Sequence, residues 1–135
     1  MAKHTLIYPG KPLRPEDLLN FIELDPFVSG WKGLGLDDEE TLTALQISIM
    51  CNPTLGDVIR GTGGLRKLRY SPPGWKSGKS GALRVCYVYF RRYGVVLLVT
   101  VYPKTRSANL SEAGKHTIRK IIERIKKALK QQHGF

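Results

Sequence analysis

Alternating and continuous apolar patterns in the second half of the chain predict three strands. Residues 65–70 (LRKLRY) form the first, and the geometry of a strand places Lys67 and Arg69 on one face and Arg66, Leu68 and Tyr70 on the other. Residues 83–90 and 95–102 are longer apolar runs, and the short segment 91–94 between them predicts a hairpin. The second run is apolar enough for a central strand.

A helix is predicted before these strands. The acidic run DDEE provides its start, with Asp37 as the cap and Glu40 three residues later, as in a capping box. Apolar residues then recur at helical spacing, and Asn52-Pro53 ends the helix. A loop rich in glycine, residues 55–64, leads to the first strand.

A second helix is predicted after the strands, starting at Ser111 with Glu112. Its apolar residues fall on one stripe, and most of its basic residues lie outside that stripe. The stripe consists of Ile118, Ile121, Ile122, Ile125 and Leu129. The predicted fold class is therefore α+β, an antiparallel sheet with helices before and after it.

The N-terminal part of the chain is less regular. Residues 1–18 contain three prolines and are predicted to be an extension with at most a short strand at residues 5–8. Residues 19–24 (LNFIEL) fit either the end of a helix or a strand. We therefore divide the chain into an extension, residues 1–18, and one domain, residues 19–132.

Composition limits the class of protein. The chain has 135 residues, of which 41% are hydrophobic, so it can bury the core of one domain. No apolar run is long enough to span a bilayer, and the N-terminus lacks the pattern of a secretory signal. Cys51 and Cys86 are far apart and lack metal-ligand spacing, which favours a reduced, cytoplasmic protein without a predicted disulfide.

The charge is distributed very unevenly. Residues 1–57 contain 4 basic and 9 acidic side chains, whereas residues 58–111 contain 11 basic side chains and no acidic one. Residues 112–135 add 7 basic and 2 acidic side chains, and the formal net charge of the chain is +11. Nucleic acid is the natural partner of such a surface. A generally basic surface and an acidic protein partner are the alternatives.

Several kinds of catalytic site do not fit the residues. The string GWKSGKS resembles a phosphate-binding loop, but Pro73 stands where that motif requires glycine and a strand follows where it requires a helix. The three histidines lie near the two ends of the chain, without a carboxylate cluster or metal-ligand spacing. We therefore expect no metal and no cofactor.

The remaining chemistry is that of cations acting on a phosphodiester. Cleavage of RNA by its own 2′-hydroxyl needs in-line geometry, stabilisation of a dianionic phosphorane, and proton transfer. Arginine and lysine meet the second need directly. Lys67 is the candidate base because the positive charges of Arg66 and Arg69 favour its neutral amine. The alternative is that these residues only bind phosphate, and the residues alone slightly favour it.

Three ordered motifs resemble a known family. PTLGDVIRGTGGLRKLRY, GKSGALRVCYVYF and VYPKTRSANLS are similar to the HigB-like branch of the RelE toxin superfamily from type II toxin–antitoxin systems. The resemblance covers roughly residues 20–130. It implies that residues 19–24 form a strand, and that the fold is a strand, two helices, three antiparallel strands and a final helix.

The resemblance also implies an activity and residue roles. Members of this family enter the ribosomal A site and cleave mRNA there without a metal. The matched catalytic positions are Lys67, Arg69, Arg84 (the scissile phosphate) and Lys104, which stands where several members have an arginine. Further RNA contacts are expected from Arg66, Lys76, Lys79, Arg106 and Asn109.

The implied partners are mRNA, the ribosome and a cognate antitoxin, in this branch commonly a helix-turn-helix protein. Two other functions stay open for the same fold. One is inhibition of DNA gyrase, as in the ParE branch of the superfamily. The other is nucleic-acid binding without catalysis. No membrane contact is expected.

Overall fold

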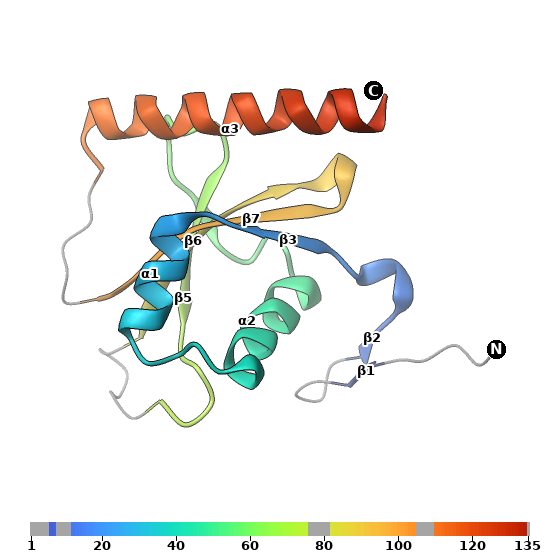
Figure 1. Cartoon of the computed structure of the whole chain (residues 1–135), viewed down its shortest axis with the longest axis vertical. Coiled ribbons are helices and arrows are strands. Elements are labelled where there is room, and N and C mark those ends of the chain that lie inside the picture. Colours follow the sequence, from blue (N-terminus) through green and yellow to red (C-terminus); the bar gives the residue numbers. More distant parts are fainter. Residues whose placement is uncertain (1–5, 8–11, 76–81, 105–109, 135) are drawn as a thin grey trace.

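The computed structural model describes residues 6–7, 12–75, 82–104 and 110–134, and it places a five-stranded sheet between two helical layers (Figure 1). The strands of the sheet are β3 (Asn20–Glu23), β4 (Asp57–Val58), β5 (Leu65–Tyr70), β6 (Leu83–Phe90) and β7 (Val95–Pro103). Their order across the sheet is β3-β7-β6-β5-β4. Helices α1 (Asp25–Gly33) and α2 (Glu39–Cys51) cover one face, and α3 (Glu112–His133) crosses the other.

The α+β class is confirmed, but the sheet is mixed rather than antiparallel throughout. Strands β4 to β7 are antiparallel neighbours, as expected. Strand β3 instead runs parallel to β7, with Asn20 opposite Val95 and Glu23 opposite Leu98. The reason is the connection: α1 and α2 lead the chain to the far edge of the sheet, and successive antiparallel turns then bring β7 beside β3 in the same direction.

The two helix starts illustrate how local signals act. Ser111 caps α3 and accepts a hydrogen bond from Gly114 N at 3.0 Å, as predicted. The cap of α2 is Asp38 rather than Asp37. The Asp38 carboxylate accepts bonds from the Thr41 amide at 3.0 Å and the Thr41 hydroxyl at 2.6 Å. Thr41 thus supplies two donors to Asp38. These bonds lower the pKa of the Asp38 carboxyl, and the bond from the Thr41 hydroxyl has the largest effect.

The N-terminal segments pack beside this domain. Short strands β1 (Leu6–Ile7) and β2 (Pro12–Leu13) pair with each other, and the one-turn helix η1 (Pro15–Asp17) follows. Leu13 is buried, so the end of the predicted extension contributes to packing. Residues 19–24 contain strand β3, as the resemblance implied, and the predicted loop at residues 55–64 contains the two-residue strand β4.

Candidate nucleic-acid interface

The face of the sheet under α3 carries both apolar and cationic side chains. Near the β6–β7 turn, this face is apolar and packs against Ile122 and Leu129 of α3. Toward the other end of β5 and β6, the apolar residues give way to Lys67, Arg69 and Arg84. These three residues come from the segment 58–111, which contains no carboxylate.

Strand register brings the three cations together. Lys67 lies opposite Cys86, and Arg69 lies opposite Arg84 in the neighbouring strand. Arg84 is in turn opposite Tyr102 of β7. Side chains on directly paired residues point to the same face, so Arg69, Arg84 and Tyr102 form a row across three strands. The predicted division of β5 into two faces is confirmed. Leu68 packs in the α1/α2 core and Tyr70 packs against it, on the face opposite to Lys67 and Arg69.

Arginine opposite arginine is an unfavourable pair for a sheet. Like charges on directly opposed residues destabilise strand pairing. The Arg84 guanidinium donates to the carbonyl oxygens of Ala82 at 3.2 Å and Leu83 at 3.5 Å, and it is half-buried. An anion bound across Arg69 and Arg84 would offset their repulsion, so this row is suited to a phosphate.

The start of β5 is held by the GTGG sequence before it. Buried Thr62 donates from its hydroxyl to Ile59 O at 2.6 Å and accepts from Leu65 N at 3.0 Å. Gly61 O accepts two bonds from the Arg119 guanidinium of α3, at 3.2 and 2.7 Å. The motif therefore joins α3 to β5 and orients the strand that carries Lys67 and Arg69.

The loop before β4 is anchored from the opposite face. The buried Tyr87 hydroxyl donates to Pro53 O at 2.9 Å and accepts from Gly56 N at 3.1 Å. Arg66 donates to Thr54 O at 3.1 Å and to Gly56 O at 2.8 Å. Arg66 is thus turned away from Lys67 and Arg69, and the structure does not bring it into the row of cations.

Sequence reasoning missed Tyr102 and Cys86 as members of this face. Strict alternation counted from Val95 would put Tyr102 on the opposite face. A β-bulge changes the count, because Cys86 pairs with Thr100 while Tyr87 pairs with Leu98, which leaves Val99 unpaired. The only sequence signal for Tyr102 was its place in the YPK part of the third motif.

Cys86 and Tyr102 are linked and remain protonated at neutral pH. Burial raises the pKa of the Cys86 thiol. A hydrogen bond with Tyr102 and the charge of Lys67 lower this pKa, but burial has the larger effect. The pKa of Tyr102 is raised to about 12. Burial is the largest cause, the nearby Cys86 is the second, and the charge of Arg84 acts in the opposite direction. The Tyr102 hydroxyl is therefore a hydrogen-bond donor rather than a base.

The other predicted contact residues are placed as follows. Lys104 comes directly after β7 and is exposed. Lys76, Lys79, Arg106 and Asn109 lie outside the described residues. Within the described ranges, no group of three or more His, Cys, Asp or Glu side chains could hold a metal ion. Nor does the described part of the chain contain a helix long and apolar enough to cross a membrane.

No family model matches the chain. Among solved structures, a double arginine-to-alanine variant of the Escherichia coli toxin RelE in the free state is similar, with a TM-score of 0.46 and 18% sequence identity. The match covers 62% of this chain and 81% of the RelE chain.

Proposed function

We propose that this protein is the toxin of a type II toxin–antitoxin system, of the HigB-like branch of the RelE superfamily, and that it cleaves mRNA on the ribosome without a metal. The observation that carries the proposal is the row Arg69–Arg84–Tyr102, with Lys67 two residues before Arg69 on β5 and on the same face. The three ordered sequence motifs support it, because Lys67, Arg69 and Arg84 all lie within them.

Each group has a role in transesterification. Arg84 binds the scissile phosphate, and Arg69 opposite it stabilises the charge that develops on the non-bridging oxygens. Lys67 accepts the proton of the attacking 2′-hydroxyl. The new bond joins the 2′-oxygen to phosphorus, the bond to the 5′-oxygen breaks, and Lys104 protonates that leaving oxygen. The products are a 2′,3′-cyclic phosphate and a 5′-hydroxyl.

Tyr102 completes the site as a positioning residue. Its hydroxyl bonds to Cys86, and its ring occupies the position beside Arg84 on β7. This arrangement restricts where the Arg84 guanidinium can lie, and a fixed donor stabilises developing charge better than a mobile one. The positive face also suits ribosomal RNA, and we expect the activity in the cytoplasm. A cognate antitoxin, of the helix-turn-helix type, would neutralise it.

The test is cleavage of a defined mRNA by the purified protein, with and without translating ribosomes, measured by primer extension. We expect cuts within codons only when ribosomes are present. Arg84→Ala should lower the cleavage rate by about 100-fold or more, since removing one donor to a developing oxyanion has effects of this size. Circular dichroism and urea unfolding establish that the variant is folded.

The matched control is Lys32→Ala, which removes an exposed cation from α1 on the opposite side of the sheet. This variant should cleave like the wild type. Full cleavage by a folded Arg84→Ala protein would contradict the role of Arg84. Intact mRNA with and without ribosomes would contradict cleavage altogether, and a DNA supercoiling assay would then distinguish gyrase inhibition from simple binding.

A further inference from the structure

A basic cleft lies at the edge of the sheet, where β6 extends past Leu65, the first residue of β5. The last pair between these strands is Leu65 with Val88. Tyr89 and Phe90 continue β6 and pair only on their other side, with β7. Among the described residues, no strand lies along this edge of β6, and a cleft of about 480 Å³ opens there.

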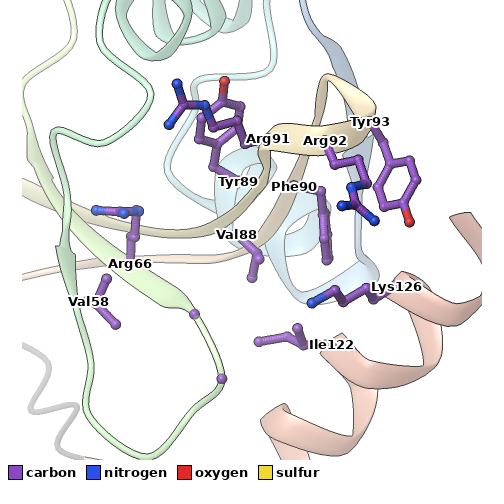
Figure 2. Close-up of a pocket in the computed structure, with 12 residues that line it drawn as sticks. Val58, Arg66, Val88, Tyr89, Phe90, Arg91, Arg92, Tyr93, Ile122 and Lys126 are labelled. Atoms are coloured by element: carbon purple, nitrogen blue, oxygen red, sulfur yellow. The ribbon is translucent and has the colours of Figure 1, made fainter. Parts of the chain in front are cut away.

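Two glycines make room for the cleft. Gly63 and Gly64 both line it and have φ angles of +79° and +124°, which residues with side chains rarely adopt. They turn the chain away from β6 immediately before β5 begins. Figure 2 shows the result: Val58 and Arg66 lie on one side of the cleft, and Phe90 and Lys126 on the other.

The lining is cationic. Arg66, Arg91, Arg92 and Lys126 all contribute to it, from β5, the β6–β7 turn and α3. None of the twelve lining residues is acidic. Arg66 is held in place by its bonds to the carbonyl oxygens of Thr54 and Gly56. This lining therefore favours a ligand that carries negative charge.

The apolar part of the lining distinguishes between two kinds of anionic ligand, an acidic polypeptide and RNA. Val58 is 53% exposed although it is in strand β4, so the cleft presents an aliphatic side chain to its ligand. The aromatic rings are poorly placed to stack on bases. Phe90 is only 7% exposed, Tyr93 contacts the His133 ring at 5.3 Å between centroids, and partly buried Tyr89 packs against the α1/α2 core. An open strand edge beside an exposed valine favours a polypeptide over RNA.

We propose that this cleft binds an extended acidic segment of a partner protein, which pairs with the edge of β6 at Tyr89–Phe90. Carboxylates of the segment contact Arg66, Arg91 and Lys126, and an apolar side chain packs on Val58. The inference deepens the partner part of the proposed function by naming a surface and a chemistry. It does not depend on RNA cleavage.

The test is direct binding to the full-length protein by fluorescence anisotropy. The probe is a labelled decapeptide of alternating glutamate and valine; the comparison probes are an alternating lysine–valine decapeptide and a single-stranded RNA decamer. We expect the acidic peptide to bind and the basic peptide not to bind. Arg91→Glu combined with Lys126→Glu should weaken acidic-peptide binding by at least about tenfold, because each charge pair becomes repulsive.

The matched control is Lys120→Glu combined with Arg124→Glu, which makes the same change in net charge at exposed positions outside the cleft. This control should bind the acidic peptide like the wild type. Equal weakening by the two double variants would contradict a specific site. RNA binding that only the cleft variant loses, without peptide binding, would identify a nucleic-acid surface instead and overturn the proposal.

Backbone pairing is tested with two further peptides, N-methylated either at all valines or at all glutamates. Only one set of amides in an extended segment can face β6, so one methylated peptide should lose binding and the other should keep it. Equal binding of both would overturn strand pairing. Because these measurements use neither ribosomes nor mRNA, their failure is distinguishable from a failure of the cleavage assay.

Discussion

The two faces of the sheet differ in how completely they are covered. On the α1/α2 face, Phe27, Leu45 and Leu98 are at most 1% exposed. Gly30 of α1 comes so close to β7 that an added Cβ would lie 2.7 Å from Val101 O. On the other face, α3 has 22 residues, and among them only Ile122 and Leu129 are buried.

The difference separates stability from binding. The α1/α2 face is sealed by close packing, and its cluster of buried apolar side chains helps to hold the fold together. The α3 face is sealed only along part of the sheet, and the remainder presents Lys67, Arg69 and Arg84. The basic side chains on this face repel one another, so their clustering does not itself stabilise the fold.

The largest expected effect is a difference in the free energy of unfolding between two leucine-to-alanine variants, one from each helical layer. Leu45→Ala in α2 should lower the free energy of unfolding by about 3–4 kcal/mol, because the rigid surroundings leave a cavity. Leu129→Ala in the last turns of α3 should lower it by about 1–2 kcal/mol, since exposed neighbours allow the site to relax or hydrate. Urea unfolding of both variants measures the difference. Equal losses would show that the two faces are packed alike.

A second prediction concerns the Tyr87 hydroxyl, which holds the loop before β4. Tyr87→Phe leaves Gly56 N and Pro53 O without this partner and should lower the free energy of unfolding by about 1–3 kcal/mol. Tyr89→Phe is the control: its ring is half-buried and its loss of a hydroxyl should change stability by less than about 0.5 kcal/mol. Similar urea midpoints for these two variants would rule out an anchoring role for Tyr87.

The smallest expected effect is a dependence of stability on alkaline pH. The pKa values of Cys86, Tyr87 and Tyr102 are all raised above their ordinary values of 9.0 and 10.0, that of Tyr102 to about 12, with burial as the first cause. Between the ordinary pKa of each group and its raised pKa in the folded protein, the unfolded chain loses a proton that the folded chain keeps. The contribution of these three groups to stability should therefore be level below about pH 9 and fall as the pH rises further.

Tyr102→Phe tests this dependence, because it removes the group whose pKa is raised to about 12. Its urea midpoint should fall less between pH 10 and pH 12 than that of the wild type. An unchanged slope in Tyr102→Phe would mean that the hydroxyl is not buried in solution. Absorbance of tyrosinate at alkaline pH gives an independent titration of the same group.

Elements with a local signal could be predicted from the sequence. Strand β5 was predicted with its observed bounds, and Ser111 was predicted as the start of α3, because turn residues and a capping hydroxyl act within a few positions. Asp37 was the wrong cap, since Asp37 and Asp38 are chemically alike. The choice depends on the two bonds that Thr41 gives to Asp38.

Features that depend on distant pairing could not be predicted in this way. The parallel pairing of β3 with β7 joins residues 20–23 to residues 95–98, and nothing in either segment specifies its direction. The bulge at Val99 changes the face of Tyr102, so alternation alone could not place that ring in the candidate site. Lys67 and Arg69 were placed correctly because β5 contains no such irregularity.

The position of β7 has a consequence for the order of events during synthesis. Strand β3 leaves the ribosome early but has no neighbour until residues 95–98 follow it, and Arg84 lacks Tyr102 beside it until the end of β7 emerges. The row Arg69–Arg84–Tyr102 is thus completed only when β7 has emerged, although Arg69 and Arg84 can pair once β5 and β6 have been made. A nascent chain that emerges beside ribosomal RNA and its own mRNA carries an incomplete site until most of it has been made.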